Sequence, residues 1–294
     1  MDGYPPASAV PQLPGSRPPG PPPLASVALG RPGPAERLIA GLRIQLIVIG
    51  ALMMREIHTR FGRHHMGYMW LFFEPMILGG CIAGLHALSG HGLPGGLDTA
   101  SFYIVGYTPY YLFRSILNRS AGALHANAPL FYHRQVTFLD IMISRNLLDG
   151  ASVMIAVLIM LGGLGAFTDV WPVDLVWMAF GITLILLFCH GFSLIIVAGT
   201  VWGTETIERL IHPLTYLTIP ITGAFFMVFW FPTEMQELIL LIPTVHMFEI
   251  IREGQFGPVV PYHYDLVYVT VWILALNLLG LLALRAAKPR LDLN

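Results

Sequence analysis

Long uncharged stretches alternate with short polar connections along most of the chain. The stretches without Asp, Glu, Lys or Arg are 75–97, 150–168, 175–204, 210–233 and 266–284. Each has 19 or more residues, close to the roughly 20 that a helix needs to cross the hydrocarbon core of a bilayer. A sixth uncharged stretch has only 15 residues, 99–113, but its Ser, Thr, Tyr and Phe side chains can reach the interfaces. The pattern predicts an all-α membrane protein with six membrane-spanning helices.

The expected transmembrane domain occupies residues 67–285, and a short cytosolic tail, 286–294, follows it. We place its spans at about 68–88, 102–117, 143–167, 175–202, 213–231 and 266–284. The segment 203–212 between the fourth and fifth spans is short and polar, so we expect a cytosolic connection there.

Two segments precede the spans. Residues 1–34 contain 11 of the 23 prolines, a composition that cannot bury a core and predicts a disordered cytosolic tail. Residues 35–66 have apolar positions at helical spacing, interrupted by arginines. We expect an amphipathic helix in the cytosolic membrane interface, although an amphipathic helix packed against protein would have a similar surface.

The stretch of about 232–262 fits neither a span nor a solvated loop. Only 11 uncharged residues separate Glu237 from Glu249, and Pro243 interrupts them. This is too short to cross and return, so we expect two short re-entrant or interfacial helices between spans five and six.

Composition and charge agree with a membrane location. The chain is 55% hydrophobic and only 11% charged, whereas soluble domains have about a quarter charged residues. All 16 basic residues can be assigned to loops. All but Arg252 fall in loops on one and the same side of the membrane. Because cytoplasmic loops collect Lys and Arg, both termini should be cytoplasmic, which requires an even number of spans.

The residue types present exclude several kinds of chemistry. A P-loop requires a lysine followed by a hydroxyl residue, but the chain has one lysine, Lys288, followed by Pro289. Any ATP must therefore be hydrolysed by another chain. We expect no cofactor, metal or nucleic-acid partner. Cys81 and Cys189 lie within predicted spans and are expected to be packing residues.

Glu74 is the main candidate for a functional group inside a span. A carboxyl among apolar residues is costly unless it is paired or faces water. Glu74 could therefore line a pathway, or it could pair with an arginine and fix helix packing. Trp70 lies one turn before it, and Trp70 and Tyr68 could stack on sugar rings or belong to an interfacial aromatic belt.

The predicted re-entrant segment has its own polar face. His246, Glu249 and Arg252 follow one another at a spacing of three residues, so they share one side of a helix. Two potential ligands do not make a zinc site, and a polar face is the better interpretation. His58, His64 and His65 are likewise expected to form a basic surface.

The stretch MREIHTRFG, 54–62, followed by MGYMWLFFEP, 66–75, resembles the start of the permease subunits of bacterial ABC exporters for capsular polysaccharide. That family has an Arg-acidic-Ile-x-x-Arg-aromatic helix and then Leu-Gly-Tyr-x-Trp-x-x-x-Glu-Pro. Met66 stands where the family commonly has Leu. The similarity continues at 121–131 and 243–253 and covers about 36–285, without the proline-rich tail.

The resemblance implies a homodimer of six-helix subunits in the bacterial inner membrane, bound to two separate ATPase subunits that hold ATP and Mg²⁺. The cargo would be a lipid-linked polysaccharide passed to periplasmic and outer-membrane partners. The resemblance also places contacts with the ATPase at six positions: Arg63, Phe131, His133, Arg134, Glu205 and Glu208. The residues themselves suggest a substrate pathway: cytosolic Arg55 and Arg60 could receive phosphate or sugar-acid groups at its entrance, or they could be ordinary positive-inside residues. Tyr68, Trp70 and Glu74 complete the candidate pathway.

Other functions remain open from the sequence. An ABC permease for O-antigen, teichoic acid or another lipid or drug would share the topology. A membrane-embedded glycosyl- or acyltransferase would need a nucleophile and base or acidic metal ligands near one interface. The sequence offers Glu74 alone, so an enzyme ranks below a transport subunit.

Overall fold

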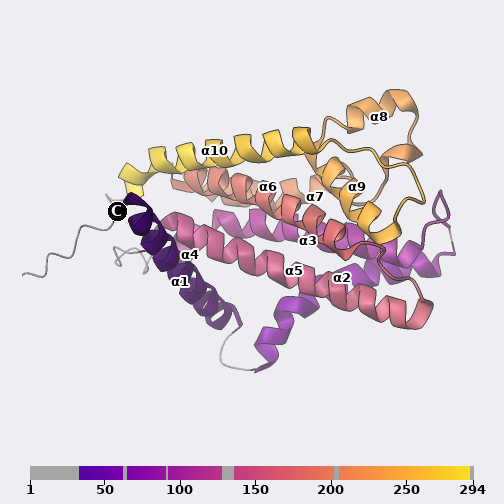
Figure 1. Cartoon of the computed structure of the whole chain (residues 1–294), viewed down its shortest axis with the longest axis horizontal. Coiled ribbons are helices and arrows are strands. Elements are labelled where there is room, and N and C mark those ends of the chain that lie inside the picture. Colours follow the sequence, from indigo (N-terminus) through magenta and orange to yellow (C-terminus); the bar gives the residue numbers. More distant parts are fainter. Residues whose placement is uncertain (1–32, 62–64, 91, 128–135, 202–204, 292–294) are drawn as a thin grey trace, which may run out of the picture. The chain divides into compact units, whose positions relative to one another are not determined.

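The computed structural model describes residues 33–61, 65–90, 92–127, 136–201 and 205–291, and all regular structure in these ranges is helical (Figure 1). The all-α expectation is confirmed for this part of the chain. The elements are α1 (Pro34–Phe61), α2 (His65–Leu88), α3 (Thr99–Ala121), α4 (Ala123–Asn127), α5 (Phe138–Thr168), α6 (Leu175–Val201), α7 (Glu205–Leu217), the 3₁₀ turn η2 (Val228–Trp230), α8 (Thr233–Ile239), α9 (Pro243–Phe256) and α10 (Leu266–Leu291).

The chain divides into two compact units, Met1–Arg43 and Ile44–Asn294. In the first unit, α1 begins where the Gly33 N–H donates to a Glu36 carboxylate oxygen at 3.0 Å, and its apolar side chains such as Leu38 are exposed.

Short polar side chains fix the starts of two long helices. The Asp98 carboxylate accepts the Ser101 N–H at 2.7 Å and caps α3. At the start of α5, Thr137 and Asp140 form a reciprocal capping box. These contacts satisfy backbone donors that have no partner within the helix, so α5 begins at Phe138, about a turn before the start that we predicted.

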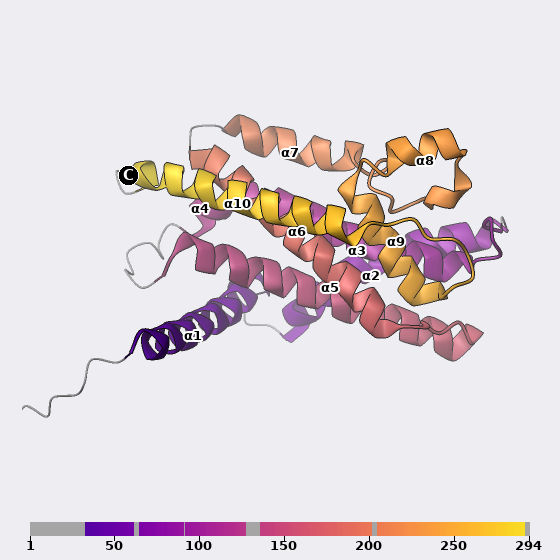
Figure 2. The same ribbon diagram turned by 45° about the horizontal axis from the view of Figure 1, so that its top comes forward.

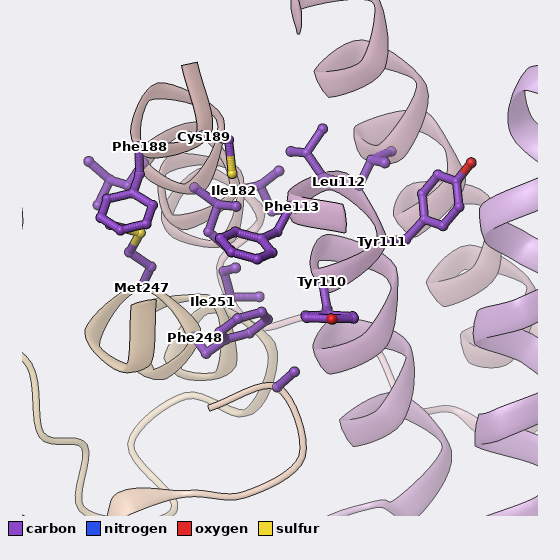
Figure 3. Packing of buried hydrophobic residues seen from close by; sticks show 14 of the residues in the cluster. Tyr110, Tyr111, Leu112, Phe113, Ile182, Phe188, Cys189, Met247, Phe248 and Ile251 are labelled. Atoms are coloured by element: carbon purple, nitrogen blue, oxygen red, sulfur yellow. The ribbon is translucent and has the colours of Figure 1, made fainter. Parts of the chain in front are cut away.

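Two helices lie at the centre of the bundle. Helix α3 packs against α2, α5, α6, α7 and α9, and helix α6 packs against α3, α5, α7, α9 and α10 (Figure 2). Figure 3 shows Phe113 of α3, Ile182 of α6 and Phe248 of α9 meeting in the core. Cys189 is buried there, as expected of a packing residue, whereas Cys81 is exposed on α2.

Four of the described helices are long and apolar enough to cross a membrane. They are Pro34–Thr59, Phe138–Thr168, Leu175–Val201 and Leu266–Ala287. The last three coincide with the predicted spans three, four and six. The first includes most of the segment expected at the interface. In α2 the apolar part is shorter, and α3 contains arginines, so a count of six spans stays a prediction.

The predicted continuous helix over 213–231 is wrong. Helix α7 begins at Glu205, inside the expected polar connection, and ends at Leu217. Irregular turns follow it, with Pro220 unable to donate a backbone hydrogen bond and the Thr218 hydroxyl bonded to the Thr215 carbonyl at 2.7 Å. Gly223 then takes a positive φ of 90°, which a glycine adopts at little cost.

The irregular segment after α7 passes directly over α3. A Cβ atom at Gly106 would overlap the carbonyl oxygen of Ala224, and this same oxygen accepts a hydrogen bond from Arg252 Nη2 at 2.8 Å. Only a glycine at this point of α3 therefore lets the segment approach closely enough for Arg252 to hold it.

Replacing Gly106 with Ala should therefore lower the free energy of unfolding by about 1–3 kcal/mol, the usual cost of overpacking. Thermal unfolding of the purified chain in mild detergent should show a lower midpoint. Gly163→Ala is the matched control, because a Cβ atom there meets nothing within 4 Å. Equal midpoints for the two variants would contradict the proposed constraint.

Candidate functional site

Two cavities with mainly polar lining residues stand out in the described part of the chain, and the larger of these lies where α1, α3, α4 and α5 meet. It has a volume of about 450 Å³, which is within the usual range for ligand sites. We call it the arginine cavity, and its lining residues are Arg55, Glu56, Thr59, Arg119, Ala126, Asn127 and Arg145. Of these, the sequence analysis singled out Arg55.

Hydrogen bonds and ion pairs hold the lining of the arginine cavity in place. Arg145 Nε lies 3.2 Å from Glu56 Oε1, and both residues are buried. The Arg55 Nη1 group donates to Asn127 Oδ1 at 3.1 Å. Asn127 is itself anchored because its Nδ2 group donates to a carbonyl oxygen of α4 at 2.9 Å. The end of α1 is thus connected to both α4 and α5.

The smaller cavity contains Glu74. Its volume is about 160 Å³, and we call it the Glu74 cavity. It is lined by Glu74, Tyr111, Arg114, Ser115, Asn118, Arg119 and His212, from α2, α3 and α7. All seven of these side chains can form hydrogen bonds.

Arg119 belongs to both cavities. Its Nη1 group donates to Asp149 Oδ1 at 2.9 Å, while Nη2 lies 4.0 Å from Glu74 Oε2. Asp149 is buried, whereas the Glu74 side chain is 41% exposed. The close pair with Asp149 is therefore the stronger of the two, and the contact between Arg119 and Glu74 is loose.

Arg114 is held by an aromatic ring. Its guanidinium lies 4.3 Å from the ring centroid of Tyr216, and it donates a hydrogen bond to the Tyr216 hydroxyl. Both the cation–π contact and the hydrogen bond stabilise the charge. They also fasten α7 to α3, next to a second polar contact in which Tyr110 donates to the Thr215 carbonyl.

The structure separates the predicted pathway residues into two groups. Arg55 lines the arginine cavity and Glu74 lines the smaller one. Trp70 lies one turn before Glu74 on α2 and is 54% exposed. Arg60 and Tyr68 lie in α1 and α2, and their side chains are outside the described part of the structure.

The predicted contacts with the ATPase fall mostly outside the described residues. This applies to Arg63, Phe131, His133 and Arg134. Glu205 and Glu208 lie in the first turn of α7, with side chains that the structure does not describe. Their role stays a prediction. Within the described ranges, no group of three or more His, Cys, Asp or Glu side chains could hold a metal ion.

The polar side of α9 is buried in the protein. Arg252 is completely buried, donates to the carbonyls of Ala224 and Phe226, and lies 4.3 Å from the Phe102 ring centroid. Burial lowers the pKa of Arg252 to about 10, so the guanidinium stays charged at neutral pH. Glu249 accepts the backbone N–H groups of Val228 and His263 at 3.2 and 3.1 Å.

Burial raises the pKa of Glu249, and the nearby Arg252 charge and the two backbone donors partly offset this effect. His246 accepts the Asp265 N–H at its Nδ1 atom, 2.9 Å away, and its Nε2 atom lies 2.7 Å from the Leu240 carbonyl oxygen. The three residues therefore share one side of α9, as predicted, but that side joins α9 to loops of the same chain.

Four charged residues that line the two cavities were not predicted as site residues: Glu56, Arg114, Arg119 and Arg145. The assignment of every basic residue to a loop is wrong, because Arg114 and Arg119 lie in α3 and Arg145 lies in α5. A periodic signal was present: Tyr107, Tyr111, Arg114 and Asn118 repeat at three- or four-residue spacing. Arg145 and Asp149 are also one turn apart, which is typical of a charged stripe on one helix face.

No family model matches the chain, but several characterised proteins do. It is 35% identical over 249 residues to the capsule polysaccharide export inner-membrane protein CtrC of Neisseria meningitidis serogroup B, covering 82% of this chain and 91% of the relative. A BexB protein of Haemophilus influenzae, described in the same words, is 35% identical over 253 residues, covering 83% and 92%.

A third relative, the polysialic acid transport protein KpsM of Escherichia coli, is 28% identical over 258 residues, covering 85% of this chain and 96% of the relative. The similarity thus extends over nearly the whole length of each relative. The chain belongs to the family of capsule polysaccharide export inner-membrane proteins.

Proposed function

We propose that the chain is the permease subunit of an ATP-driven exporter that moves lipid-linked capsular polysaccharide across the bacterial inner membrane. The single observation that carries this function is 35% identity to capsule polysaccharide export inner-membrane proteins over more than four fifths of the chain. The bundle of apolar helices with internal polar cavities supports a transport role.

A separate subunit supplies the energy in this proposal. The only lysine, Lys288, is followed by Pro289, so the chain lacks the lysine and hydroxyl pair of a P-loop. Two ATP-binding subunits would bind the cytosolic side, near the predicted contacts of Arg63, Phe131, His133, Arg134, Glu205 and Glu208. The polymer would pass from the permease to periplasmic and outer-membrane partners.

The permease acts as a homodimer in this proposal, with its pathway at the twofold interface. Charged side chains within membrane helices face protein or water because exposure to lipid is costly. Glu74 and Arg119 are 41% and 31% exposed in the single chain, on α2 and α3. A second copy placed against this side would shield them from lipid and enclose a polar pathway.

The topology in this proposal has six spans, with α8 and α9 as re-entrant helices on the outer side and both termini in the cytoplasm. Helix α7 and the turns after it form the fifth crossing. Their irregular backbone is compatible with the membrane because it packs on α3 and α9, where Arg252 satisfies two of its carbonyls.

Deleting the gene in its host should abolish surface capsule while lipid-linked polymer accumulates inside the cell. Immunoblotting of surface and intracellular polymer measures both pools, and the intact gene supplied on a plasmid should restore export. Absence of polymer in both pools would instead indicate a role in synthesis.

Glu74→Gln should reduce capsule export by roughly tenfold, equivalent to about 1.4 kcal/mol, without preventing membrane insertion. The substitution removes the charge but preserves the shape of the side chain. Glu234→Gln, in the exposed helix α8, is the matched control and should export normally. Normal export by the Glu74 variant would contradict a role of this carboxylate in export and leave it only a role in helix packing.

A cytoplasm-active reporter fused after Asn294 should be active, and a periplasm-active reporter at the same position should be silent. The expectation follows from an even number of spans and from the arginines on the cytosolic side. The opposite pattern of the two reporters would contradict the six-span topology.

A further inference from the structure

We propose that the arginine cavity binds a monoanionic phosphate group, of the kind that a phosphodiester lipid headgroup carries. Its part in export rests on the proposed function, whereas the binding itself rests on the residues that line the cavity.

The cavity has an excess of positive charge. Arg55, Arg119 and Arg145 line it together with a single carboxylate, Glu56. Asp149 is not a lining residue, but its Oδ1 atom lies 2.9 Å from Arg119 Nη1 and neutralises this arginine. Arg145 and Arg119 each have a close carboxylate, and Arg119 also lies 4.0 Å from Glu74. Arg55 has no ion pair among the described residues, so its positive charge is the one that an anion in the cavity would complement.

Arg55 has the donors to meet such an anion. Among the described residues its side chain makes one hydrogen bond, to the neutral amide oxygen of Asn127. A guanidinium has five N–H donors, so several remain for a ligand in the cavity. Asn127 is buried and bonded to a carbonyl oxygen of its own helix α4, and the buried Glu56 is paired with Arg145 of α5. The walls around Arg55 are therefore fixed in advance of binding.

The geometry favours phosphate over a sugar carboxylate. The three arginines come from α1, α3 and α5, so their donors approach the cavity from three directions. A planar carboxylate is typically bound by two parallel bonds from one arginine, whereas a tetrahedral phosphate offers oxygens to several donors at once. The volume of about 450 Å³ also suits a phosphate with its ester substituents.

The position of the cavity favours a lipid as the source of the phosphate. Helix α4, which forms part of the wall, lies toward the end of the bundle where α10 ends, opposite to α8 (Figures 1 and 2). The proposed topology puts this end at the cytosolic leaflet. Met54 next to Arg55 is 57% exposed, so α1 presents apolar and cationic side chains together, as interfacial helices do.

Titration of the purified full chain in dodecyl maltoside tests the site. The probes are short-chain phosphatidylglycerol, phosphatidylcholine of the same chain length and inorganic phosphate, and thermal unfolding and ³¹P NMR report binding. Phosphatidylglycerol should raise the unfolding midpoint in proportion to its occupancy. Phosphatidylcholine, with no net charge, should bind at least tenfold more weakly.

Arg55→Gln should weaken phosphatidylglycerol binding by roughly tenfold, the effect of losing one charge-assisted contact. Arg285→Gln, an exposed arginine on α10, is the matched control and should bind like the unmodified chain. If Arg55→Gln fails to fold, Arg55→Lys can be used instead, because it keeps the charge but lacks the planar group. This variant should show a smaller but measurable loss of phosphatidylglycerol affinity.

Equal phosphatidylglycerol affinity in the Arg55 and Arg285 variants would overturn the site, and so would equal binding of phosphatidylcholine. Binding of inorganic phosphate alone, with the same dependence on Arg55, would support the anion site but overturn a lipid as its source. If the Arg55→Gln variant loses phosphatidylglycerol binding but still exports a normal amount of capsule, the binding site is supported and its role in export is contradicted. Capsule that persists after gene deletion would contradict the proposed function without affecting the binding result.

Discussion

A single buried arginine determines how one end of the helix bundle is organised. Arg252 is completely enclosed, and its contacts reach α3 through Phe102 and the segment after α7 through two carbonyl oxygens. A charge in such a place is stable only when its donors are bonded. The turns after α7 provide the acceptors because their carbonyls have left the helical hydrogen-bonding pattern. The irregular segment and the buried charge therefore stabilise each other.

The hydrophobic pattern predicted the apolar helices well, and it failed where polar residues continue a helix. Long uncharged runs located α5, α6 and α10, because an apolar run of about 20 residues suits the hydrocarbon core whichever helices lie beside it. Helix α3 continues past Arg114 and Arg119 to Ala121, since each arginine finds a partner on another helix. Helix α7 shows the reverse case: an uncharged run with proline and threonine loses its helical bonds after Leu217. The composition of a segment does not show which residues of other helices its side chains will contact.

The candidate site was predicted in part for the same reason. Arg55 and Glu74 could be identified because a charge within or beside an apolar run is conspicuous in a sequence. Arg145, paired with Glu56, and Arg119, paired with Asp149, depend on contacts between residues 89 and 30 positions apart. The helical spacing of the polar α3 residues indicates a stripe, but the helix that faces this stripe becomes evident only in three dimensions.

The shared position of Arg119 has a consequence for how the two cavities behave. One guanidinium forms part of both walls, so a ligand that draws it toward one chamber changes the electrostatic potential in the other. Linkage requires that any such effect on binding affinity be reciprocal. Ligands bound in the two chambers would therefore be thermodynamically coupled, and substitutions in one chamber would have non-additive effects when combined with substitutions in the other.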